Sequence, residues 1–152
     1  MVVMHWKWQK FNDISGFEMH EILSVRQRVF IVEQQCIYLD ADGLDKYSYH
    51  LTGRSEEGEL RVYARVTYPG KRFEEPSIGR ILAVMDFRGK GHARKAVQLA
   101  IKKIKKEFPG QNIKISAQMY LLNFYSSLGF CQISESYDED GIEHVDMILE
   151  QQ

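Results

Sequence analysis

The residues whose types and spacing point most directly to chemistry are the run from Arg88 to Ala93, which reads Arg-Gly-Lys-Gly-His-Ala. This run follows an apolar segment, residues 78–85, and opens an amphipathic segment that ends near Phe108. That order predicts a strand, a glycine-rich turn and a helix. Gly89 and Gly91 would let a ligand approach the backbone closely. The free N–H groups and positive dipole end of the helix favour an anion, so the run is predicted to cradle a phosphate.

Three kinds of phosphate-binding turn place glycines at comparable spacing. A Walker A loop needs the spacing GxxxxGK[ST], which the chain lacks. A dinucleotide-binding turn needs a third glycine, where Arg94 stands, and an acidic residue about 20 positions later, where Gly110 and Gln111 stand. The run instead resembles the [Q/R]xxGx[G/A] turn of the GNAT N-acetyltransferases, which Arg88, Gly91 and Ala93 match. A tight strand-to-helix turn without any ligand is the alternative.

A second segment, residues 120–130, supplies the context for that resemblance. It follows an expected short strand and would form a short helix that ends at Gly129, a favoured residue at that position. It resembles the Asn-x-x-Phe-Tyr-x-x-x-Gly-Phe element that follows the fifth strand of GNAT enzymes. Asn123 lies closer to Phe124 than in the commonest family spacing. Tyr125 stands out from its apolar neighbours because a phenol both donates and accepts hydrogen bonds.

Length and composition bound the class of protein. The chain has 152 residues, 44% hydrophobic and 27% charged, which predicts one globular domain over residues 1–152. Its net charge of -1 does not favour general attraction to nucleic acid or to membranes. No apolar run approaches the ~20 residues of a membrane-spanning helix. Residues 1–11 lack the apolar core of a signal peptide, and Cys36 and Cys131 lack metal-ligand spacing. We therefore expect a cytoplasmic protein with reduced thiols.

Hydrophobic periodicity places the elements that must position these segments. A strand is expected over residues 4–10, and a helix begins at a capping box formed by Ser15 and Glu18 and runs to about Val32. The remaining elements are expected as a loop at 33–46, strands at 47–53, 60–68 and 78–85, a helix at 91–108, a strand at 113–117, a short helix, and two strands around Asp140 and Gly141. This order agrees with the fold of the GNAT family, a mixed, mostly antiparallel central sheet flanked by helices.

The resemblance extends over almost the whole chain. Residues 26–34 and the acidic loop that follows are similar to the ElaA-like subfamily of GNAT proteins, as are residues 78–80 and 137–144. Two positions depart from the family pattern. Ile37 stands where the subfamily usually has proline, which removes a stiff turn, and Met85 replaces a proline common just before the glycine-rich turn.

This resemblance implies how acetyl-CoA would bind. The pyrophosphate would contact the backbone N–H groups of the turn, which comprises Arg88, Gly89, Lys90, Gly91, His92 and Ala93. The pantetheine arm would pair with the main chain of Leu82, Ala83 and Val84, where the fourth and fifth strands of the family splay apart. Asn123 and Tyr125 would also contact the coenzyme. No metal is implied, and the acidic loop lacks the calcium-binding spacing because Leu51 stands where a glutamate is required.

The reaction implied is direct transfer of an acetyl group from acetyl-CoA to an amine. Tyr125 matches the family residue that gives a proton to, or contacts, the departing sulfur. Glu33 and His144 are both candidates for the base that deprotonates the amine. A backbone N–H near Ala83 or Val84 would stabilise the oxyanion. His50 is expected to be structural.

Several roles stay open at this point. Arg26 and Arg80 would either shape the acceptor pocket or pair with the acidic loop, and Asp40, Asp42 and Asp45 would either attract a cationic acceptor or cap backbone groups.

The acceptor is a small amine or a peptide amine. The alternative function is a non-catalytic acyl-CoA-binding module, and a nucleic-acid-binding protein is disfavoured by the charge. A homodimer paired through sheet edges fits the fold, although no residue decides it.

Overall fold

A computed structural model describes residues 3–151, so the two ends of the domain expected over residues 1–152 lie outside the described part. The main elements, in chain order, are β1 (His5–Lys10), α1 (Gly16–Arg26), a π-helix (Gln27–Glu33), β2 (Ser48–Arg54), β3 (Leu60–Thr67), β4 (Ser77–Ala83), α2 (His92–Glu107), β5 (Ile113–Gln118), α3 (Leu122–Ser126), β6 (Cys131–Gln132), β7 (Tyr137–Glu139) and β8 (Ile142–Leu149). The expected order is confirmed, with β6 as an additional short strand. None of the helices over residues 3–151 is long and apolar enough to cross a membrane.

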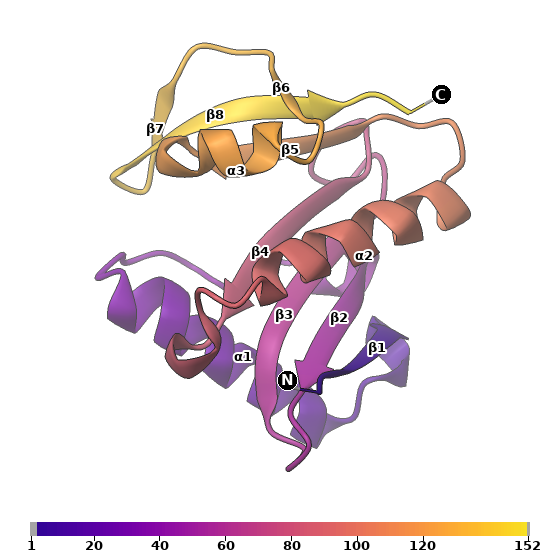
Figure 1. The fold of residues 1–152 in the computed structure, drawn as a ribbon, viewed down its shortest axis with the longest axis vertical. Helices are drawn as coiled ribbons and strands as arrows, with labels where there is room; N and C mark the ends of the chain where they lie inside the picture. Colours follow the sequence, from indigo (N-terminus) through magenta and orange to yellow (C-terminus); the bar gives the residue numbers. More distant parts are fainter. Residues whose placement is uncertain (1–2, 152) are drawn as a thin grey trace.

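The strands form two antiparallel sheets rather than one continuous sheet. The first has the order β1-β2-β3-β4, and the second has the order β5-β8-β6, with β7 also pairing with β8. The sheets meet at the starts of β4 and β5, where the Lys114 N–H donates to the Pro76 carbonyl oxygen at 3.1 Å. Figure 1 shows β4 and β5 diverging beyond that point. The C-terminal ends of β4 and β5 are therefore not paired with each other, and the region between them is called the slot below.

The capping box starts α1 as the sequence predicts. The Ser15 hydroxyl accepts from the Glu18 N–H at 3.1 Å, and the Ser15 N–H donates to the Glu18 carboxylate at 3.1 Å. The helix departs from expectation at its other end, because the coil widens after Arg26 into the π-helix. This wider coil ends at Glu33, one residue beyond the predicted end, and so places Glu33 at the end of the element.

The two long helices cover opposite faces of the first sheet. Ile22 of α1 packs with Tyr63 of β3 and Leu82 of β4, whereas Ala96 of α2 packs with Val62 and Ala64 of β3. Successive β3 residues point to opposite faces, so both faces of this strand are buried. Figure 1 shows α2 in front of the sheet and α1 behind it.

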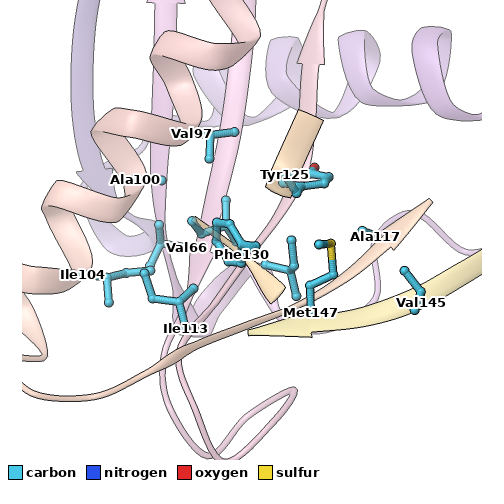
Figure 2. Close-up of a cluster of buried hydrophobic side chains, with 12 residues drawn as sticks. Val66, Val97, Ala100, Ile104, Ile113, Ala117, Tyr125, Phe130, Val145 and Met147 are labelled. Atoms are coloured by element: carbon cyan, nitrogen blue, oxygen red, sulfur yellow. The ribbon is translucent and has the colours of Figure 1, made fainter. Parts of the chain in front are cut away.

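The largest apolar cluster joins α2 to the second sheet. Its buried members from α2 are Val97, Ala100 and Ile104. They meet apolar side chains of β5, β8 and the residue that precedes β6, namely Ile113, Ile115, Ala117, Phe130, Val145 and Met147. Figure 2 shows these side chains interleaving, with Tyr125 at the edge of the cluster. The apolar stripe of α2 therefore fixes the second sheet relative to the first.

Candidate functional site

The glycine-rich turn exposes its backbone, which is compatible with the predicted anion cradle. Gly89 and Gly91 have φ values of +73° and +83°, a left-handed conformation that side-chain-bearing residues rarely adopt. A Cβ atom added to either glycine would meet no other atom within 4 Å, so the space above the turn is open. Gly91 is also the residue from which α2 begins, without any side-chain cap. The turn thus presents bare backbone at the helix start.

The N–H groups of this turn are available to a ligand. Within residues 3–151, no hydrogen bond to the protein engages the N–H groups of residues 89–93. The Arg88 N–H differs, because it donates to the Met85 carbonyl oxygen at 3.3 Å. The first N–H groups of a helix have no partner inside the helix and carry its positive dipole end. Five of the six predicted cradle residues therefore offer a free donor.

The end of β4 presents one residue to the slot. The Val84 N–H donates to the Arg61 carbonyl oxygen at 2.9 Å, so Val84 is bonded toward β3. Along an antiparallel strand the bonding direction alternates, and the N–H and C=O of Ala83 must therefore point away from β3. In agreement, the Ala83 carbonyl oxygen accepts from Arg88 Nε at 2.8 Å instead of from β3. Of Leu82, Ala83 and Val84, only Ala83 directs its main chain into the slot.

A β-bulge bends β4 where it leaves β5. The β3–β4 register passes from the pair Tyr63–Leu82 to the pair Arg65–Gly79, so Arg80 and Ile81 together face one β3 residue. Arg80 has a φ of +50°, which is uncommon for a residue with a side chain. Bulges of this kind increase local twist and redirect side chains. Here the bulge turns Arg80 toward the acidic loop.

A cavity of about 690 Å³ lies between β4, β5, the β7–β8 hairpin and the segment that follows the π-helix. Tyr125 and His144 both line it, although they come from α3 and β8. Glu33 is not among the lining residues. The aromatic side chains of the lining are Phe30, Tyr38, Phe73, Tyr120, Tyr125 and Tyr137. The cavity thus brings together two of the three predicted catalytic residues.

Tyr125 is held by aromatic neighbours. Its ring meets Phe124 and Phe130 edge to face, with centroid separations of 5.1 and 5.9 Å. The residue is 8% exposed, and this burial raises the pKa of the phenol well above its usual value near 10. The hydroxyl therefore stays protonated at neutral pH. Asn123, two residues earlier, is exposed on α3.

His144 has one ring nitrogen fixed and the other facing a carboxylate. Its Nδ1 lies 2.7 Å from the Ile142 carbonyl oxygen, which can only accept, so Nδ1 carries a proton. The lone pair of a neutral ring is then on Nε2, which lies 3.3 Å from a carboxylate oxygen of Glu139. The ring also stacks on Tyr137, with 6.2 Å between centroids. His144 is 8% exposed and cannot rotate freely.

Two other predicted residues take different positions. Glu33 forms an ion pair with Arg88, with 2.6 Å between Oε2 and Nη2. His50 is buried between the Tyr63 hydroxyl, 2.6 Å from Nδ1, and the Asp45 carbonyl oxygen, 2.8 Å from Nε2. Burial lowers the pKa of His50, which keeps the ring neutral. The expectation that His50 is structural is confirmed.

The acidic loop pairs with three arginines. Arg26 contacts Asp40 at 2.9 Å and Asp45 at 2.7 Å, and it is completely buried. Arg65 and Arg80 complete the set with the contacts Arg65–Asp42, Arg65–Asp45, Arg80–Asp40 and Arg80–Asp42. Three carboxylates thus share three guanidiniums. Of the two roles left open for Arg26 and Arg80, pairing with the acidic loop is the one observed. Within the loop, Asp42 caps the Leu44 N–H at 3.1 Å, and the three guanidiniums balance the three carboxylates, which leaves no excess negative charge there for a cationic acceptor.

Sequence reasoning missed a polar group on the second sheet. The Tyr137 hydroxyl donates to Asp146 Oδ1 at 2.6 Å and also contacts the Ser116 hydroxyl. All three line the cavity. Their approach depends on the pairing of β5 and β7 with β8, in which Ser116 faces Asp146 and Tyr137 faces His144. The alternation of apolar and polar residues in β5 predicts which of its side chains point outward. No local signal predicts which residues of β8 lie opposite them.

Comparison with known proteins agrees with this architecture. The family model for the acetyltransferase (GNAT) domain matches residues 32–151. A UPF0039 protein of Synechocystis is 51% identical over 96% of this chain and 95% of its own. The ElaA protein of Escherichia coli is 31% identical over 97% of each chain.

Solved structures give the same result. An acyl-CoA N-acyltransferase from Pseudomonas aeruginosa superposes with a TM-score of 0.92 at 30% identity, covering 97% of this chain and 99% of the other. Escherichia coli ElaA superposes with a TM-score of 0.90 at 31% identity, covering 97% and 100%. The expected fold is confirmed, and the chain belongs to the GNAT acetyltransferase family, within its ElaA-like group.

Proposed function

We propose that this protein transfers an acetyl group from acetyl-CoA directly to a primary amine. Three features found together in this fold carry the proposal. Free N–H groups lie at the start of α2, a single main-chain position of β4 faces the slot, and Tyr125 and His144 line one cavity that also touches β4 and β5. Membership of an acyltransferase family supports the acyl-CoA part of the proposal.

The proposed coenzyme site has two parts, the glycine-rich turn for the pyrophosphate and the slot for the pantetheine arm. The N–H groups of residues 89–93 donate to the pyrophosphate, where the helix dipole adds favourable charge. The Ala83 C=O, which points away from β3, is the acceptor that we assign to an amide N–H of the pantetheine arm. Asn123 lies on the exposed side of α3 and would contact the coenzyme through its side chain.

The Ala83 N–H is the donor that we assign to the thioester carbonyl. The Val84 N–H already donates to Arg61, which leaves Ala83 as the candidate that faces the slot. A backbone N–H aimed at the developing oxyanion stabilises the transition state more than the ground state. The β4 ladder holds this donor rigidly, because the flanking residues Leu82 and Val84 are paired with β3.

Tyr125 acts on the departing sulfur. The pKa of a thiol is about 8.5, whereas burial raises the pKa of the Tyr125 phenol well above 10. Complete transfer of the phenol proton to the CoA thiolate is therefore unfavourable. The phenol instead donates a hydrogen bond as negative charge develops on sulfur. A hydrogen bond to a charged group is stronger than a neutral one, and the aromatic packing aims the ring without cost during the reaction.

His144 is the base that we assign to the amine. An ammonium ion is not nucleophilic, and a neutral imidazole with its lone pair on Nε2 removes the proton directly or through a water. Once protonated, Nε2 faces the Glu139 carboxylate at 3.3 Å, which stabilises the new positive charge. Glu33 is the second candidate, and its pairing with Arg88 makes it the less available of the two.

The experiment is release of CoA from acetyl-CoA in the presence of single amines. The panel contains a polyamine, an amino sugar, a peptide with a free N-terminus and a peptide with a free lysine. Release stimulated by one class of amine, with the N-acetylated product found by mass spectrometry, supports the proposal. Tight binding of acetyl-CoA without stimulation by any amine supports the alternative, a non-catalytic acyl-CoA-binding module.

A further inference from the structure

Arg88 connects the coenzyme cradle to the end of the π-helix. It is the first residue of the glycine-rich turn, and its side chain is 42% exposed. Nε donates to the Ala83 carbonyl oxygen at 2.8 Å, and Nη2 donates to Glu33 at 2.6 Å. One guanidinium therefore touches the slot-facing carbonyl of β4 and a candidate base at the same time.

Both contacts oppose the binding of the coenzyme. The Ala83 carbonyl oxygen is the main-chain acceptor that faces the slot, and Arg88 already donates to it. The Glu33 carboxylate occupies the Arg88 guanidinium and offsets its positive charge, which an anion in the neighbouring cradle would otherwise attract. A pyrophosphate at the neighbouring N–H groups competes with Glu33 for that guanidinium, because Arg binds phosphate and carboxylate with the same two-pronged geometry.

We infer that Glu33 restrains Arg88 in the free protein and that the coenzyme phosphates take Arg88 from it, which frees the Glu33 carboxylate only in the coenzyme complex. This inference rests on the proposed function, since it requires an acyl-CoA in the cradle. It assigns Glu33 as a positioning residue that acts on coenzyme binding through Arg88.

Competition between Glu33 and the coenzyme phosphates for Arg88 should be measurable as a change in the affinity for acetyl-CoA. Replacement of Glu33 by Gln removes the competitor and tightens acetyl-CoA binding, whereas a residue that merely supports the site would weaken binding when lost. Ion pairs between partly exposed side chains are weak, so the expected change is about two- to fivefold in Kd. Both side chains are partly exposed, and neither variant should disturb folding.

A double-mutant cycle separates this link from a general charge effect. Acetyl-CoA is titrated by calorimetry into the parent protein, Glu33→Gln, Arg88→Gln and the double variant. Arg88→Gln alone weakens binding, and in that background Glu33→Gln no longer tightens it. Asp86→Asn is the matched control, because Asp86 is an exposed carboxylate in the turn just before the cradle. It reports what loss of one nearby negative charge does by itself.

Two results would overturn the inference. The first is that Glu33→Gln binds acetyl-CoA as tightly as the parent protein or more weakly. The second is that Glu33→Gln tightens acetyl-CoA binding equally in the parent protein and in the Arg88→Gln background. If the parent protein binds acetyl-CoA and these results appear, only the link is wrong and the proposed function stands. If the parent protein does not bind acetyl-CoA, the proposed function and the link fall together.

Discussion

Tyr125 and His144 line the same cavity, Tyr125 from α3 and His144 from β8, the central strand of the second sheet. Tyr125 is fixed by two aromatic rings, and His144 by a carbonyl oxygen and the ring of Tyr137. A hydrogen-bond donor and a proton acceptor are therefore both held in place before any ligand arrives. Variants of the two residues should have different and separable effects.

Replacement of Tyr125 by Phe should lower turnover and leave coenzyme affinity unchanged. The ring keeps its packing against Phe124 and Phe130, and only the hydroxyl is lost, which we propose donates to the departing sulfur. A hydrogen bond to a charged group is worth about 1.5–3 kcal/mol, so kcat should fall about 10- to 100-fold. Steady-state kinetics and calorimetry measure the two quantities. Parent-like turnover would exclude the role of Tyr125 at the sulfur.

Replacement of His144 by Gln should abolish most of the turnover while acetyl-CoA still binds. General-base catalysis contributes about 10²- to 10⁴-fold, and the amide of glutamine cannot accept a proton at neutral pH. His144 is 8% exposed, so thermal unfolding and coenzyme titration must first show that the variant is folded. If Glu33→Gln removes turnover and His144→Gln retains it, Glu33 is the base.

Replacement of Gly91 by Val should destroy the cradle. Gly91 has a φ of +83°, and a side chain there both strains the backbone by about 1–2 kcal/mol and covers the N–H groups. Gly110, beyond the other end of α2, has a φ of +80° and equally open surroundings, so Gly110→Val is the matched control. Both variants should lose similar stability, but only Gly91→Val should lose acetyl-CoA binding. Equal coenzyme affinity in the two variants would remove the cradle hypothesis.

Acid should weaken the ion pairs of the acidic loop. Burial alone would raise the pKa of Asp42, but its hydrogen bonds and attraction to Arg65, with help from Leu44 and Arg80, lower the pKa from 3.8 to about 2. A carboxyl whose pKa is lowered by folding stabilises the fold above about pH 4 and loses that contribution as the pH falls toward 2. The contribution of Asp42 is about 2 kcal/mol at most.

Urea unfolding at several pH values between 7 and 3 measures this loss. The free energy of unfolding of the parent protein should fall below about pH 4. Asp42→Asn should be less stable at pH 7 and should show a shallower decline in the acid range, because it has no proton to take up. Asp86→Asn, at an exposed position, should follow the parent curve. Identical acid slopes for the parent and Asp42→Asn would show that this pair does not govern acid stability.

The sequence predicts correctly those features whose cause lies in neighbouring residues of the chain. Gly89 and Gly91 have positive φ values that their residue type anticipates, and the turn lies between a strand and a helix as its flanking patterns predict. The start of α1 follows from the capping box at Ser15. In each case the signal and the structure lie within a few residues of each other, so tertiary packing does not need to be known.

The remaining features depend on contacts between distant segments. Arg26 pairs with Asp40 and Asp45 only because the loop folds back over α1. The register between β3 and β4 decides whether the N–H of Ala83 or that of Val84 bonds to β3. The sequence of one strand does not fix this register. The widening of α1 into a π-helix after Arg26 has no signal in its residues that we can identify.

Calorimetric titration of the protein with acetyl-CoA, with NAD and ATP as control ligands, tests the proposed coenzyme site most directly. We expect one site with a Kd in the micromolar range for acetyl-CoA and no binding of the two controls. Absence of acetyl-CoA binding, or equal binding of all three ligands, would contradict this expectation.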